Sequence, residues 1–179
     1  MYILNLFYQE CNLIIIVTWV FLHCNFHIKV YWEEQPMADT NDLKKITEYA
    51  IRRISDDLSV TLITRKIPVG SQGRLKEFDG VSADSSVVVQ IINHGGYTSG
   101  GKLPSAKIKN TYADCYFLNL THAKRKILAI TNQEFFSIFK DKSQGFLNDI
   151  EVLFIDLSDE LKEMAKKVIK SASEEMAKE

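Results

Sequence analysis

Hydrophobic and polar residues after Met37 follow two periods in turn, which predict a helix and then a meander of three strands. Apolar residues first recur at helical spacing behind an N-cap at Asp39 or Thr40, at Leu43, Ile46, Ala50 and Ile54. Three segments with β-branched or alternating residues then predict strands, at residues 58–65, 74–81 and 87–92. The third segment is apolar except for Gln90, which is typical of a strand buried on both faces.

The second half of the chain alternates helices with strands. Residues 93–102 contain four glycines and cannot form regular structure, whereas Pro104 suits the first turn of a helix that runs to about His122. Short apolar strands are expected at residues 126–130 and 150–155, and Thr131 with Glu134 predicts a capping box for the helix between them. A final amphipathic helix begins near residue 158. The pattern predicts an α/β domain with a mixed sheet flanked by helices.

Residues 1–36 differ in composition from the rest of the chain. They contain one basic residue, Lys29, and an apolar run at residues 13–22. This run is shorter than the roughly 20 residues that cross a bilayer, and it has neither the basic start nor the cleavage site of a signal peptide. Two interpretations remain open: translation starts at Met37, or residues 1–36 form a weak membrane anchor. We therefore expect an apolar leader at residues 1–36 and a single domain at residues 37–179.

Net charge and cysteine content bear on the expected binding partners and cellular compartment. The formal net charge is −1, which gives no overall attraction to nucleic acid or to membranes. The three cysteines are an odd number and lack the spacing of metal ligands. A reducing compartment is the simplest interpretation, so we expect a cytoplasmic protein, with the membrane anchor as the less favoured alternative.

Two polar residues on consecutive predicted strands are candidates for a functional site. Asp79 lies at the end of one strand before Gly80, and Gln90-Ile91-Ile92 lies on the next. With the predicted order αβββαβαβα, residues 39–156 resemble the PD-(D/E)XK nuclease superfamily, in which an acid ends one strand and a (D/E)-X-K tripeptide lies on the next. The resemblance implies a restriction-endonuclease-like fold. It also implies Mg²⁺-dependent phosphodiester cleavage of nucleic acid, with DNA as the expected partner. No small-molecule cofactor is implied, and a homodimer is compatible with the family.

The tripeptide departs from the motif at both of its functional positions. Magnesium is held by carboxylates, water and substrate phosphate, whereas Gln90 offers an uncharged oxygen and Ile92 offers no polar group. Glu77 shares a strand face with Asp79 in the predicted alternation and is a candidate second carboxylate. Lys102 and Lys107 begin the next helix and are candidates for the missing lysine. The expected metal site is thus Asp79, Glu77 and Gln90, and the expected catalytic residues are Asp79, Gln90, Lys102 and Lys107.

Structural explanations exist for the same residues. An aspartate before glycine is most often a turn residue, and a glutamine in an apolar strand needs a buried hydrogen bond. Three functions remain open at this stage. The first is a metal-dependent endonuclease or a descendant of one. The second is an inactive domain on the same fold that binds nucleic acid or protein. The third is an interaction protein tethered to a membrane by residues 13–32.

Overall fold

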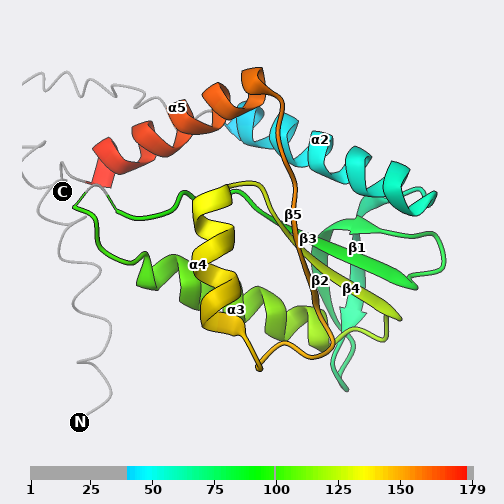
Figure 1. Cartoon of the computed structure of the whole chain (residues 1–179). Coiled ribbons are helices and arrows are strands. Elements are labelled where there is room, and N and C mark those ends of the chain that lie inside the picture. Colours follow the sequence, from blue (N-terminus) through cyan, green and yellow to red (C-terminus); the bar gives the residue numbers. More distant parts are fainter. Residues whose placement is uncertain (1–39, 99, 177–179) are drawn as a thin grey trace, which may run out of the picture. The chain divides into compact units, whose positions relative to one another are not determined.

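The computed structural model describes residues 40–98 and 100–176, which form one mixed sheet with helices on both faces (Figure 1). The predicted α/β class is confirmed. Along the chain the elements are α2 (Thr40–Leu58), β1 (Ile63–Val69), β2 (Arg74–Val81), β3 (Val87–Ile92), α3 (Ser105–Asn119), β4 (Arg125–Ile130), α4 (Gln133–Ser143), β5 (Glu151–Phe154) and α5 (Asp159–Met176).

The sheet keeps the strands in chain order, β1-β2-β3-β4-β5. The pairs β1–β2 and β2–β3 are antiparallel, whereas β3–β4 and β4–β5 are parallel. Strand β2 therefore runs opposite to the other four strands of this sheet. Parallel neighbours need a crossover connection, and α3 and α4 provide the two crossovers.

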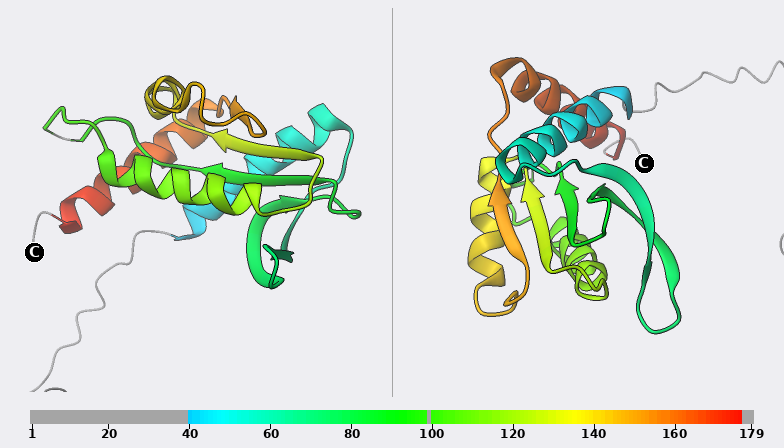
Figure 2. Two further views of the ribbon diagram at one scale, coloured as in Figure 1. Left: turned by 90° about the horizontal axis from the view of Figure 1, so that it is seen from below. Right: turned by 90° about the vertical axis from the view of Figure 1, so that its right-hand side faces the viewer.

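Two cores lie on opposite faces of the sheet. Val88 and Ile92 of β3 join the core beneath α3 and α4, while Val89 and Ile91 join the core beneath α2. The near-continuous apolar run of β3 follows from this double burial, as the sequence predicts. Figure 2 shows the resulting layers, with α3 and α4 on one face and α2 and α5 on the other.

The predicted position of the first strand, at residues 58–65, is wrong. Helix α2 continues through Asp56 and Asp57, which are exposed on its outer side, and β1 begins only at Ile63. The helix ends where Ser59 adopts a left-handed φ of 52° and its amide donates to the Asp56 carbonyl at 3.1 Å. Strand β1 also includes Pro68, which an edge strand tolerates because its outer amides need no partner.

The predicted capping box of α4 is also wrong. Asn132 is the N-cap, and its Oδ1 accepts from the Phe135 amide at 2.8 Å. Thr131 instead donates through Oγ1 to Asn93 Oδ1 at 2.8 Å, and Glu134 Oε2 accepts from the Tyr97 amide at 3.0 Å. Both side chains therefore bind the segment that follows β3 and hold the glycine-rich loop against the start of α4.

The expected leader, including the apolar run at residues 13–22, lies outside the described residues. Within residues 40–98 and 100–176, no helix has both the length and the apolar character needed to cross a lipid bilayer.

Replacing Gly80 with alanine should destabilise the domain. A Cβ at this position would lie 2.7 Å from Ile51 Cδ1, 3.3 Å from Val89 Cβ and 3.4 Å from Leu62 Cβ. Overpacking of this kind costs about 1–3 kcal/mol. Urea unfolding measures the loss, and Gly100→Ala is the control because its Cβ would meet nothing within 4 Å. Equal stability of the two variants would contradict the tight packing at Gly80.

Candidate functional site

Strand β2 contains a bulge at Asp79. Ile63 pairs with Val81 and Arg65 pairs with Phe78, so Thr64 alone faces both Asp79 and Gly80. Thr64 Oγ1 donates to the Asp79 carbonyl at 3.1 Å. Bulges of this kind redirect side chains and increase the local twist. As a result Phe78 and Val81 both enter the core beneath α3 and α4, which strict alternation would not allow.

The carboxylate of Asp79 bridges β2 and β3 where their main-chain pairing stops. The two strands pair through Gly80–Val89 and Val81–Val88. Beyond these pairs, the amide of Ile91 donates to Asp79 Oδ2 at 2.7 Å, and Gln90 Nε2 donates to the same oxygen at 2.6 Å. The structure thus brings together Asp79 and Gln90, the two residues that the sequence singled out, in direct contact.

The amide of Gln90 leaves one oxygen without a partner. Its nitrogen faces Asp79, and its Oε1 is buried with no hydrogen-bond donor among the described residues. A buried carbonyl oxygen without a partner is unfavourable. The position therefore favours a ligand that can approach this oxygen with positive charge or with a donor.

A second carboxylate and an ammonium group lie near Asp79. Burial is the main cause that raises the pKa of Asp79, with the hydrogen bond from Ile91 opposing it; Asp114 raises that pKa further and Lys76 lowers it. Burial also raises the pKa of Asp114, again opposed by Lys76. The Lys76 ammonium lies 5.3 Å from the centre of the Phe117 ring on α3. Two acids and one cation thus gather between β2 and α3.

Sequence reasoning missed Asp114 and Lys76. A signal for Asp114 was present, because it lies within a helical stripe that also contains Thr111, Cys115 and Leu118, all three of them buried. An acid within such a stripe faces a protein interior. Lys76 carried no comparable signal, since its place near Asp79 depends on the bulge.

The remaining candidates lie elsewhere around this group. Glu77 is 60% exposed, and its Oε2 is 3.9 Å from Lys66 Nζ on β1, although it still slightly raises the pKa of Asp79. Lys102 is exposed in the loop before α3, and its amide donates to Thr98 Oγ1 at 3.1 Å. Lys107 lies near His94, whose pKa is lowered mainly by burial and also by this lysine. Along α3, Lys107 precedes Asp114 by about two turns, roughly 10 Å.

The group offers oxygen ligands but few charges for a metal ion. Within the described part of the chain, no cluster of three or more His, Cys, Asp or Glu residues could hold a metal. The oxygens available near Asp79 are the carboxylates of Asp79 and Asp114 and the unpaired Oε1 of Gln90. Hard oxygen donors of this type are those that Mg²⁺ accepts, usually with several waters. The donor atoms near Asp79 are thus of the chemical type that Mg²⁺ accepts, with two carboxylates and one neutral oxygen.

A cleft borders Asp79 on the side of α2. It has a volume of about 740 Å³ and lies between α2 and the first two strands. Its wall includes Thr47 and Arg52 of α2, Thr64 of β1 and Asp79 of β2. Among the residues proposed for the site, Asp79 lines this cleft, whereas Gln90, Asp114 and Lys76 do not.

Comparisons of the chain with protein-family models, with curated proteins and with solved structures gave no match. The chemistry of the site must therefore be inferred from its own geometry.

Replacing Asp114 with asparagine should stabilise the protein at pH 7. Because burial raises the folded-state pKa above 3.8, ionised Asp114 opposes folding, and this penalty grows as pH rises through the folded-state pKa. The advantage of the variant should therefore shrink as pH falls toward 3.8. Urea unfolding at pH 7 and near the ordinary pKa of 3.8 measures both effects. A variant less stable than the natural protein at pH 7 would contradict this account.

Asp84→Asn is the control, because it should change the stability at pH 7 in the opposite direction. Asp84 accepts from the Ser86 amide at 3.0 Å and from Ser82 Oγ at 2.7 Å, and these bonds, the first above all, lower its pKa to about 2. Its ionised form therefore stabilises the fold above pH 3.8, and this contribution is lost as pH falls toward 2. The Asp84 variant should be less stable than the natural protein at pH 7.

Proposed function

We propose that this protein is nuclease-like and that it binds a divalent cation, Mg²⁺ or Mn²⁺, at Asp79, Gln90 and Asp114 to act on the phosphodiesters of nucleic acid, with DNA as the expected substrate. The observation that carries the proposal is the contact between Asp79 and Gln90. It places an ionisable acid beside a buried carbonyl oxygen that lacks a partner. A cation would satisfy that oxygen and would offset the two half-buried carboxylates.

The order and direction of the elements support a restriction-endonuclease-like fold. A helix, an antiparallel meander of three strands and two helical crossovers follow one another along the chain. Asp79 lies where β2 and β3 separate, and Gln90 lies on the neighbouring strand. In the proposed assignment, Asp79 would take the part of the acid and Gln90 that of the first tripeptide residue of the PD-(D/E)XK pattern.

Each residue would have a distinct part in such a site. When bound, the cation would polarise a phosphoryl oxygen and lower the pKa of a bound water. Gln90 Nε2 and the Ile91 amide fix one carboxylate oxygen of Asp79, so its other oxygen is the one available to a ligand. Lys76 is the cation that influences both acids, and we propose it as the group that contacts phosphate, ahead of Lys102 and Lys107.

The alternative is a domain on the same fold that binds nucleic acid without cleaving it. One observation favours it: Ile92, at the lysine position of the motif, is 3% exposed and belongs to the core beneath α3 and α4. A core residue at this position cannot activate water. Under this alternative, binding should weaken as salt rises, and Asp79 should contribute little to it.

A reducing, cytoplasmic location also remains part of the proposal. Cys115 is a buried free thiol, and burial raises its pKa to about 12. Such a thiol stays protonated and is a poor nucleophile. Its burial is consistent with a structural role in a reducing environment.

Metal binding by the full chain tests the proposal first. Titration calorimetry with Mn²⁺ should detect a weak site in the natural protein. Asp79→Ala should weaken that binding about tenfold or more, in the range for lost groups that support a metal site. Gln90→Glu should strengthen it, because a carboxylate replaces a neutral oxygen. Asp84→Asn is the matched control, since it removes one acid from a turn outside the site.

Cleavage of plasmid DNA separates the two functions. Metal-dependent cleavage that disappears in Asp79→Ala and persists in Asp84→Asn would support the nuclease. Metal binding without cleavage would favour the binding domain. Binding of Mn²⁺ that is the same in the natural protein and in Asp79→Ala would contradict the proposed site.

A further inference from the structure

A second cavity opens at the carboxyl ends of the parallel strands, away from Asp79. Its volume is about 530 Å³, and it reaches from Thr131 after β4 to Asp156 after β5. Helix α4 leaves β4 toward the face covered by α3, whereas α5 leaves β5 toward the face covered by α2 (Figure 2). Neighbouring parallel strands whose helices depart to opposite faces leave a crevice between them, which is where open α/β sheets bind ligands. We call this cavity the carboxyl-end crevice.

The carboxyl-end crevice has an apolar part and a polar part. Phe154, Leu157 and Ile169 provide apolar surface, and Lys162 and Lys166 approach from α5. The first residues of α4 complete the polar part, through Thr131, Asn132 and Gln133. A small number of polar groups beside apolar surface, in a volume of this size, is typical of sites for small molecules.

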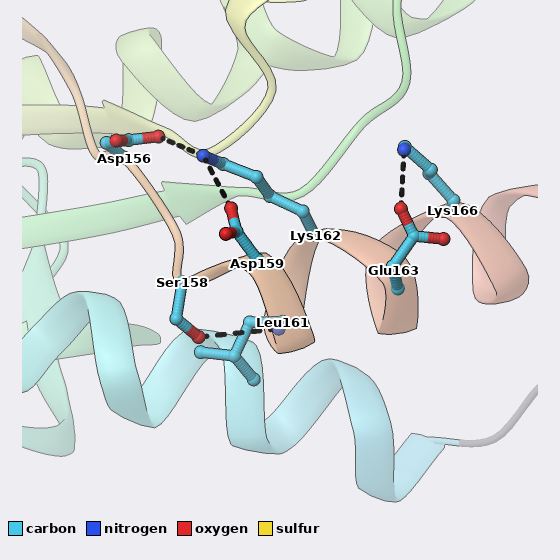
Figure 3. A network of polar contacts seen from close by, with 7 residues as sticks. All are labelled: Asp156, Ser158, Asp159, Leu161, Lys162, Glu163 and Lys166. Carbon is cyan, nitrogen blue, oxygen red and sulfur yellow. Dashed lines mark hydrogen bonds and ion pairs between the residues drawn. The ribbon is translucent and has the colours of Figure 1, made fainter.

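The two lysines are held by ion pairs that an anion can replace. Figure 3 shows Lys162 extending from α5 to Asp156, with Nζ 2.9 Å from Oδ1, and Asp159 at 3.7 Å on the same ammonium. Lys166 Nζ lies 2.6 Å from Glu163 Oε1. All five side chains are at least 43% exposed, so their ion pairs contribute little to stability and are screened by salt.

The start of α4 adds main-chain donors beside these lysines. The first amides of a helix have no partner within the helix, and Asn132 caps that of Phe135. The preceding amides, those of Gln133 and Glu134, lie at the positive end of the helix dipole. Once it displaces Asp156 and Asp159 from Lys162 and Glu163 from Lys166, a doubly charged anion can contact both ammonium groups and the helix start, which a single carboxylate cannot do as well.

We propose that the carboxyl-end crevice binds a small organic phosphate. The phosphate lies between Lys162, Lys166 and the start of α4, and its apolar or aromatic body covers Phe154, Leu157 and Ile169. The acids around the lysines, Asp156, Asp159 and Glu163, disfavour a long polyanion such as nucleic acid and so favour a compact ligand. The crevice shares no residue with the group around Asp79, so this inference is independent of the proposed nuclease.

Amide NMR of the full chain tests the crevice with three probes: inorganic phosphate, adenosine and AMP, at constant ionic strength. Phosphate and AMP should shift the amide signals of Gln133 and Glu134 and should saturate. AMP should do so at about tenfold lower concentration than phosphate, because its base covers apolar surface. Adenosine alone should bind more weakly than AMP. The proposal fails if neither phosphate nor AMP shifts these signals, or if adenosine binds as tightly as AMP.

Variants of Lys162 and Lys166 test whether these two lysines bind the phosphate group. Lys162→Ala with Lys166→Ala should weaken AMP binding about tenfold or more, as expected when charged hydrogen bonds are lost. The matched control is Lys140→Ala with Lys142→Ala, two exposed lysines in the last turn of α4, and it should leave binding unchanged. Lys166→Ala alone removes one exposed side chain and should give an intermediate loss in a folded protein. Equal losses in the test and control pairs would overturn the proposal.

Discussion

The hydrogen bond from the Ile91 amide to the carboxylate of Asp79 is the interaction on which the centre of the sheet depends. It joins β2 to β3 where main-chain pairing ends, and it exists because a bulge turns the Asp79 side chain toward β3. Partial burial of a carboxylate is unfavourable unless donors approach it, and here the Ile91 amide and the Gln90 side chain donate to one oxygen of Asp79. The same bulge brings Gly80 against Ile51 of α2. The packing of the sheet and the geometry of the candidate site therefore both depend on the bulge at Asp79.

The predictable parts of the fold were those with a clear hydrophobic period. Strand β3 was located correctly because both of its faces are buried. Gln90 could be singled out because it interrupts this apolar strand, and Asp79 because it ends the preceding strand before Gly80. The start of β1 was misplaced because the helix continues to Leu58, through Asp56 and Asp57, whose exposed side chains do not interrupt it. Asp114 and Lys76 join Asp79 only through the bulge and the packing of α3. No periodicity in the sequence encodes that arrangement.

The two candidate sites use different parts of one topology. The group around Asp79 lies within the antiparallel half of the sheet, where two strands separate. The carboxyl-end crevice lies in the parallel half, where two helices separate. Polar groups lie beside each gap. Continued strand pairing would cover them in the first site, and a helix packed across the gap would cover them in the second. In each site, lysine and acidic side chains occur together, so that the positive charges partly neutralise the negative ones.

The contact between Glu134 and the Tyr97 amide has a consequence for the charge around the crevice. Glu134 is in the first turn of α4, where its carboxylate would ordinarily compete with an incoming anion for the helix amides. Gly96 has no side chain, and this allows the carboxylate to lie against the glycine-rich loop and accept from the loop backbone. The Tyr97 amide thus occupies one oxygen of the Glu134 carboxylate. The missing side chain at Gly96 therefore decides where a charged group of α4 can lie, although the two residues belong to different segments of the chain.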